Sequence, residues 1–158
     1  NSNECGQTQF ASLRAAYDAL PESRKRELED KAAIHHYAYS RRNTGIQLTN
    51  AEEDKRFPPV PQALVRVNPK NGRKALYVNP GFTLRFEGWT EEESRPLLDF
   101  LYRHAARPEF QTRFAWRPGS VAFWDNRATW HYAANDYQGE RRLMHRITIS
   151  GCALKAAA

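Results

Sequence analysis

The spacing of apolar residues changes partway along this chain, and that change constrains the fold more than any other feature. Up to about residue 33, apolar side chains recur at helical intervals in the segments 10–20 and 21–33. From residue 63 they recur mainly at every second position, as in strands with one buried face. Helices first, then strands with one embedded helix, predict an antiparallel sheet or barrel with flanking helices rather than a parallel β-α-β array.

The expected strands are short and separated by turn signals. They are residues 64–67, 74–78, 112–116, 121–124, 128–132 and 143–149. One helix is expected among them, because Thr90 and Glu93 form a capping box ahead of an apolar stripe. Residues 40–62 are polar and rich in turn formers, so we expect a lid or connector there. Residues 153–158 are expected to be a disordered or artificially added tail.

The bulk properties fit a single domain, residues 1–158. The chain has 158 residues, 41% of them hydrophobic, and no apolar run near the roughly 20 residues that cross a bilayer. The net charge is +6, but the 24 basic and 18 acidic residues are interspersed and no nucleic-acid-binding motif occurs. The two cysteines lack metal-ligand spacing. We therefore expect a cytoplasmic protein with reduced thiols and no nucleic-acid or membrane partner, and the sequence leaves a homo-oligomer open.

His131 is the histidine whose context best suits a metal ligand. It lies on an expected strand between two aromatic residues, behind an Asp-Asn turn. A lone histidine is more often a satisfied core residue than a ligand, so this context alone leaves both readings open. The other histidines are expected at a helix end, in the last turn of a helix, or out of phase with nearby arginines on a strand: His35, His36, His104 and His145.

Arg142 and Arg146 are four residues apart on an expected strand and therefore share one face. At about 3.3 Å per residue their Cα atoms would be ~13 Å apart, too far to clamp one carboxylate as a pair. They could serve two anions, or one anion and one structural partner, and the alternative is a surface strand with ordinary ion pairs. Inside a closed barrel, guanidiniums would need anionic partners such as a carboxylate or a sulfonate.

Five segments in chain order carry a family resemblance: Gly6–Leu20, Val65–Val78, Pro108–Phe110, Trp124–Arg127 and His131–Arg146. Together they resemble the taurine dioxygenase / aryloxyalkanoate dioxygenase (TauD/TfdA) family of Fe(II)- and 2-oxoglutarate-dependent oxygenases. The resemblance implies a mainly β fold with flanking helices, the double-stranded β-helix or jelly roll. It also implies an iron site of two histidines and one carboxylate, with open positions for 2-oxoglutarate and O₂.

The resemblance also implies roles for particular residues. His131 would be the distal metal ligand, and Trp124 would pack beside the metal site. Arg142 would hold the far carboxylate of 2-oxoglutarate with help from the Thr8 hydroxyl. Arg146 would meet the anionic group of the substrate. The implied activity is hydroxylation of a small anionic substrate, with taurine-like or alkylsulfonate substrates favoured over aryloxyalkanoates, and no catalytic residue beyond the metal site is implied.

The chain departs from the family pattern at the metal. No His-x-Asp or His-x-Glu occurs in it, and in the family that pair lies upstream of the segment that begins here at Gly6. We therefore expect a jelly roll without its N-terminal strands, and an enzyme only if residues upstream of Asn1 supply the pair. The alternative is a catalytically incomplete, anion-binding remnant of the fold. A basic interaction module, a third possibility, would bind nucleic acid with strong salt dependence.

Overall fold

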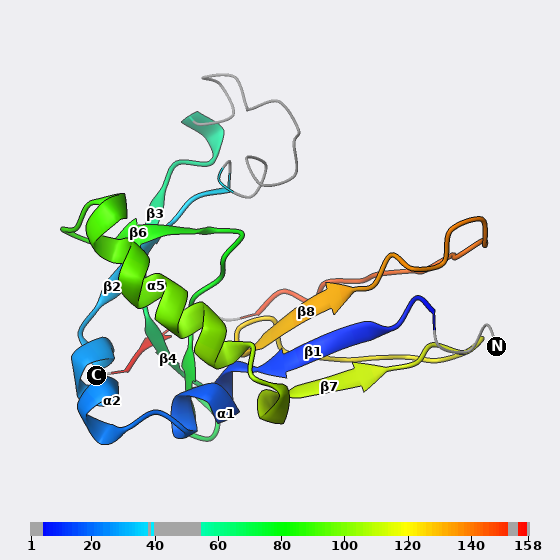
Figure 1. Cartoon of the computed structure of the whole chain (residues 1–158), viewed down its shortest axis with the longest axis horizontal. Coiled ribbons are helices and arrows are strands. Elements are labelled where there is room, and N and C mark those ends of the chain that lie inside the picture. Colours follow the sequence, from blue (N-terminus) through cyan, green and yellow to red (C-terminus); the bar gives the residue numbers. More distant parts are fainter. Residues whose placement is uncertain (1–4, 38, 40–54, 152–154, 158) are drawn as a thin grey trace.

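The computed structural model describes residues 5–37, 39, 55–151 and 155–157, and within these it is mainly β with helices packed at one end (Figure 1). The strands are β1 Thr8–Ser12, β2 Ala32–His35, β3 Val60–Ala63, β4 Val65–Val67, β5 Lys74–Leu76, β6 Thr83–Phe86, β7 Gln111–Phe114, β8 Thr129–Ala133 and β9 Lys155–Ala156. The helices are α1 Leu13–Asp18, α2 Glu22–Glu29, α5 Glu91–Ala105 and the 3₁₀ helix Pro108–Phe110. The described strands form three antiparallel sheets, ordered β7-β1-β8, β3-β2-β6 and β5-β4-β9.

Helix α5 forms where the capping box predicts it. The Glu93 N–H donates to Thr90 Oγ1 at 3.1 Å, and the Thr90 N–H donates to Glu93 Oε2 at 2.7 Å. The helix buries Leu101 completely. In its last turn a ring nitrogen of His104 lies 2.7 Å from the carbonyl oxygen of Ala16, which ties α5 to α1. The capping box therefore starts a helix that covers the core.

The N-terminal helix is shorter than predicted. The apolar spacing indicated a helix over 10–20, but β1 takes Thr8–Ser12 and α1 begins only at Leu13. Strand β1 is hydrogen-bonded on both sides, to β7 and to β8, and this long-range pairing overrides the local helical spacing. Ser12 then caps the helix, because its Oγ accepts from the Ala15 N–H at 3.2 Å.

The second helix also ends early. Helix α2 stops at Glu29, and Ala32–His35 forms β2 between β3 and β6. The prediction of a helix end at His35 is therefore wrong, because His35 lies on a strand. The His36 N–H donates to the carbonyl of Phe82, and helical Tyr37 follows directly.

Two predicted strands are absent from the described structure. Residues 121–124 and 143–149 adopt no regular strand, and their apolar side chains stay in solvent, with Phe123 85% and Ile147 90% exposed. A strand requires a hydrogen-bonding neighbour, and within the described residues these two segments have none in any sheet. The strand prediction is therefore wrong for both.

The ends of the predicted lid and tail contain strands. Residues 60–62 of the expected connector belong to β3; residues 38 and 40–54 lie outside the described part. Within the expected tail, Lys155–Ala156 forms β9 against β4, and Ala157 is only 7% exposed, so these residues differ from the disordered tail we expected. No helix in the described structure is long and apolar enough to cross a membrane.

Candidate active site

The sheet β7-β1-β8 brings distant candidate residues onto one face. In its register Thr8 lies opposite Ala133, and Phe10 lies opposite both His131 and Thr112. Residues directly opposite each other on paired strands project from the same face of a sheet. Thr8, Phe10 and His131 therefore share a face, which is called the site face below.

Trp124 packs against His131 on the site face. The two ring centres are 5.1 Å apart, and Trp124 lies at the same distance from the Phe10 ring. The indole Nε1 of Trp124 donates to Asn126 Oδ1 at 2.8 Å, which fixes the orientation of the ring. The structure thus brings Trp124 and His131 together, as the sequence analysis expected of a tryptophan beside the metal-ligand candidate.

A mostly apolar groove of about 440 Å³ runs along the same sheet. Its walls come from both strands and loops: Phe10, Ser12, Phe110, Thr112, Phe114, Val121, Ala122, Phe123, Trp124 and Thr129. A small ligand that entered this groove would meet apolar walls with few polar groups, the usual composition of a small-molecule site.

Two effects lower the pKa of the His131 imidazole from its ordinary value. The first is burial of part of the ring, and the second is the positive charge of Arg146. His131 as a residue remains exposed, so the desolvation is confined to the part of the ring that packs on its neighbours. Both effects disfavour the imidazolium, so the neutral ring, the form that binds metals, persists to lower pH.

The hydroxyl of Thr8 has a defined partner. Thr8 is 5% exposed, and its Oγ1 accepts a hydrogen bond of 2.9 Å from the indole Nε1 of Trp116. Because this bond uses a lone pair of the oxygen, the Thr8 O–H can still donate to a ligand. Trp116 was not singled out from the sequence. Strand alternation was the available signal, since Trp116 continues the series of Thr112 and Phe114 on the site face.

Arg142 lies over a glycine at the start of β1. A Cβ on Gly6 would lie 3.4 Å from Cδ and Nε of Arg142 and 3.3 Å from Cδ1 of Tyr137. Gly6 also has a φ of +67°, and its N–H donates to Asp136 Oδ1 at 2.6 Å. The guanidinium carbon of Arg142 is 5.4 Å from the centre of the Tyr137 ring. The missing side chain of Gly6 thus makes room for Arg142 two residues before Thr8.

The side chains of Arg146 and Arg142 have different neighbours. Its charge lowers the pKa of His131, whereas Arg142 packs on Gly6 and Tyr137. No carboxylate of the described residues forms an ion pair with either arginine. The strand that would have spaced them is absent, but the two guanidiniums still have separate environments.

The described residues do not complete an iron site. They contain no group of three His, Cys, Asp or Glu side chains that could hold a metal ion. His131 supplies one imidazole, and one ligand does not fix Fe(II) in the two-histidine, one-carboxylate geometry. The fit to iron is therefore partial within the described structure.

Comparison with known proteins shows which family the chain resembles. The family described as "Taurine catabolism dioxygenase TauD, TfdA family" matches residues 1–148. An alkylsulfatase of Acinetobacter baylyi is 33% identical over 92% of this chain and 48% of its own length. The alpha-ketoglutarate-dependent 2,4-dichlorophenoxyacetate dioxygenase of a Burkholderia sp. is 36% identical over 92% and 49%. The crystal structure of AAD-2 with Mn(II) and N-oxalylglycine is 37% identical, with a TM-score of 0.76 over 87% of this chain and 54% of that one.

The chain belongs to the TauD/TfdA family, because the family match covers nearly all of it. Its fold, mainly β with flanking helices, is of the jelly-roll type of its structural neighbours, which confirms the predicted fold class. The chain spans about half the length of the curated relatives it matches.

Proposed function

We propose that this chain forms part of a 2-oxoglutarate-dependent, non-haem iron dioxygenase that hydroxylates a small anionic substrate. The observation that carries the proposal is the juxtaposition on one sheet face of a buried threonine hydroxyl and an imidazole whose pKa is lowered. Arg146 contributes to that lowering, and Arg142 packs on Gly6, two residues before Thr8. This arrangement suits one metal ligand and two anions. Family membership makes 2-oxoglutarate and a substrate anion the natural occupants.

Arg142 and Thr8 would hold the far carboxylate of 2-oxoglutarate. Arg142 is orientated by the Tyr137 ring and by the space above Gly6, and Thr8 retains an O–H to donate. A guanidinium and a hydroxyl together give a carboxylate charge-assisted hydrogen bonds and a fixed orientation. A relative of 37% identity, AAD-2, was crystallised with N-oxalylglycine, which is likewise a small dianion.

Arg146 would meet the anionic group of the substrate beside His131 and Trp124. We favour a taurine-like or alkylsulfonate substrate, because the segment His131–Arg146 resembles those enzymes more closely. The relatives include both an alkylsulfatase and an aryloxyacetate dioxygenase, so the choice rests on that segment. The apolar groove would take the uncharged part of the substrate and exclude water from it.

His131 would supply one ligand to Fe(II), and the remaining ligands would come from residues outside the described structure. The described residues would position the molecules that bind at this site, because Arg142, Arg146 and Thr8 would hold their anionic groups. Trp124 packs against one side of the His131 imidazole.

The second candidate is an anion-binding remnant of the fold that binds no iron. The observation that favours it is the lack, in the described part of the chain, of a cluster that could hold a metal ion. It predicts that 2-oxoglutarate binds equally well with and without Fe(II), and that no succinate forms.

One assay separates the two candidates. The purified protein that carries this chain is first weighed by intact mass spectrometry, which shows whether residues beyond these 158 accompany it. It is then incubated with Fe(II), 2-oxoglutarate, O₂ and either taurine or phenoxyacetate. Succinate formation that depends on Fe(II) supports the dioxygenase. Binding of 2-oxoglutarate without succinate formation supports the anion-binding remnant. If the protein neither binds 2-oxoglutarate nor forms succinate, the proposed anion site is wrong.

Arginine variants then test the two roles. Arg142→Ala should weaken 2-oxoglutarate binding about tenfold or more, because it removes a charge-assisted contact. Arg146→Ala should weaken taurine binding and spare 2-oxoglutarate. Arg141→Ala, an exposed neighbour, is the matched control and should change neither constant. If Arg146→Ala weakens 2-oxoglutarate binding alone, the two assignments are reversed.

A further inference from the structure

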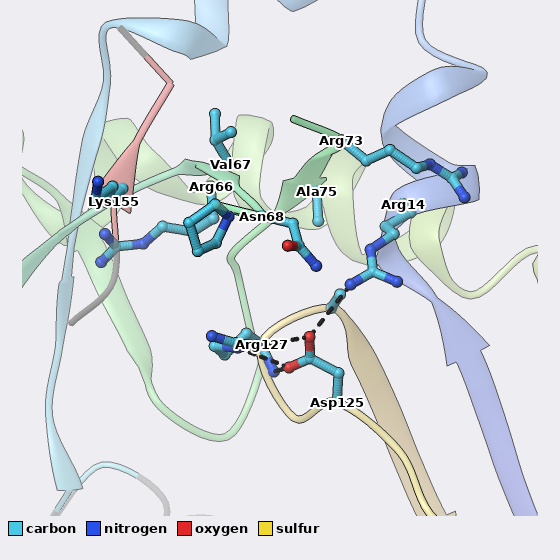
Figure 2. A pocket seen from close by; sticks show the side chains of 11 residues that line it. Arg14, Arg66, Val67, Asn68, Arg73, Ala75, Asp125, Arg127 and Lys155 are labelled. Atoms are coloured by element: carbon cyan, nitrogen blue, oxygen red, sulfur yellow. Dashed lines mark hydrogen bonds and ion pairs between the residues drawn. The ribbon is translucent and has the colours of Figure 1, made fainter. Parts of the chain in front are cut away.

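A second cleft, separate from the groove on the site face, has a strongly basic lining (Figure 2). Five basic side chains line this cleft, which is called the cationic cleft below: Arg14, Arg66, Arg73, Arg127 and Lys155. They converge from α1, from the β4–β5 hairpin, from the turn before β8 and from β9. Among the residues that line this cleft, none also lines the apolar groove. The cleft is therefore a separate feature of the molecule.

The positive charge of the cleft is only partly neutralised by its own acidic groups. Asp125 is the single carboxylate that lines it, and it is shared by Arg14 at 3.2 Å and by Arg127, whose Nε lies 2.8 Å away. Arg73 pairs at 3.0 Å with Asp18, which lies outside the lining. No ion pair to Arg66 or Lys155 is found in the described structure. An excess of positive charge in a confined place favours an anionic ligand.

Arg66 gives the strongest indication that the positive charge of the cationic cleft needs an anionic partner. The residue is only 8% exposed, and its Nε is buried without a hydrogen-bond partner. Its other described contacts are uncharged: one terminal nitrogen donates to Gln62, and the guanidinium lies 5.0 Å from the centre of the Tyr77 ring. A buried charge with no counter-charge is costly, and burial lowers the pKa of Arg66 accordingly. A bound anion would offset this cost.

Figure 2 shows how the side chains are arranged around the cleft. Arg66 and Lys155 lie on one side, Arg14 and Arg73 on the other, and Arg127 with Asp125 below, with Asn68 between the two sides. The free space is about 20 Å³, room for a single small ion rather than an extended ligand.

We propose that the cationic cleft binds one free tetrahedral oxyanion, inorganic sulfate or phosphate, with Arg66 and Lys155 as its main partners. Guanidiniums give such ions paired hydrogen bonds, and the small free space suits a compact ion better than the larger body of a phosphate ester.

The test is thermal unfolding of the chain in increasing sulfate or phosphate, against chloride at matched ionic strength. We expect Tm to rise with the oxyanions alone, steeply at low concentration and then only with the logarithm of concentration, because binding to the folded state adds RT ln(1 + [anion]/Kd) to its stability. General salting-out by sulfate would instead raise Tm in proportion to concentration, with no steep initial rise, and would contradict the proposal. Adenosine monophosphate is the ester probe, and stabilisation equal to that of phosphate would overturn the assignment to a free ion.

Three variants locate the site. Arg66→Met should raise Tm in chloride, because it removes an uncompensated buried charge, and should weaken oxyanion binding about tenfold or more. Lys155→Gln is exposed, preserves the fold and should also weaken binding. Arg113→Gln removes the same charge from an exposed position on β7, outside the cleft. If Arg113→Gln weakens the oxyanion response as much as Lys155→Gln does, or if neither cleft variant weakens it, the proposal is wrong.

Discussion

The two ends of this molecule differ in how completely they bury their apolar residues (Figure 1). At the helical end, where α1, α2 and α5 pack on the sheets β3-β2-β6 and β5-β4-β9, Leu28, Leu64 and Leu101 are fully buried. At the other end, the sheet β7-β1-β8 and the extended segments beside it leave Phe123 and Ile147 almost fully exposed. The candidate active site lies at this second end.

The difference follows from how helices and strands satisfy their backbone. A helix forms its backbone hydrogen bonds internally and has to bury only one apolar face. Helix α5 therefore needs contact with only a few sheet residues. A strand at the edge of a sheet has a free row of backbone groups and needs a neighbour. β1 has two neighbours, but β7 and β8 each pair on one side only within the described structure. The site therefore lies at the end of the molecule that leaves its large apolar residues most exposed.

The largest expected effect contrasts a buried and an exposed residue from the two ends. Leu101→Ala should lower the free energy of unfolding by about 2–5 kcal/mol, because it leaves a cavity in the core. Phe123→Ala, at an 85% exposed position, should change it by no more than about 0.5 kcal/mol. Urea denaturation followed by circular dichroism measures both. A loss at Phe123 as large as at Leu101 would mean that the exposed segment is packed in solution, and the comparison would fail.

The next effect concerns acid sensitivity, which we expect at the helical end. Burial of His35, assisted by the nearby charge of Arg66, lowers its pKa to about 4, and a hydrogen bond with the Tyr77 backbone opposes this shift. As pH falls below 6.5, His35 is protonated in the unfolded chain before it is protonated in the folded one. The free energy of unfolding therefore falls between pH 6.5 and about pH 4, and His35 does not affect it above pH 6.5. The loss should reach about 3 kcal/mol.

His35→Gln should remove most of that loss, as measured by urea denaturation at pH 6.5 and at pH 4. His145→Gln, which removes an exposed histidine at the other end, is the matched control and should keep the wild-type pH dependence. If the two variants respond to acid alike, the ends do not differ in this respect.

Local signals were sufficient to predict two features of the helical end, helix α5 and the β4–β5 hairpin. The Thr90–Glu93 capping box correctly located α5. The turn after Asn68 joins β4 to β5, with Gly72 at a φ of +68° and its N–H bonded to the Asn68 carbonyl. In both cases residues within a few positions of each other determine the structure, so a short stretch of sequence contains the information.

Long-range pairing explains the failures. Phe10 belongs to a helical spacing, yet two strands more than 100 residues away hold it in β1. Residues 143–149 alternate as a strand should, but without a neighbour the alternation does not make one. The resemblance to the family singled out Thr8, Trp124 and His131, which the structure brings to one sheet, and their roles stay predictions. Trp116 was missed because its partner Thr8 is 108 positions away.

The smallest effect tests whether the site sheet orients its own ligand groups. Trp116→Phe keeps an aromatic ring, though a smaller one, but removes the N–H that donates to Thr8 Oγ1, so the hydroxyl loses its fixed orientation. We expect 2-oxoglutarate binding to weaken by up to about tenfold, the value of one hydrogen bond, with little change in stability. Calorimetric titration with 2-oxoglutarate measures this, and Trp89→Phe, at the helical end, is the matched control. Thr8→Val should weaken binding by at least as much, and adding Trp116→Phe to it should cause no further loss. If the losses of 2-oxoglutarate affinity in the two variants add up, Trp116 acts by packing rather than through the Thr8 hydroxyl. The order of the site sheet would then depend on side-chain packing, as at the helical end, and not on this hydrogen bond.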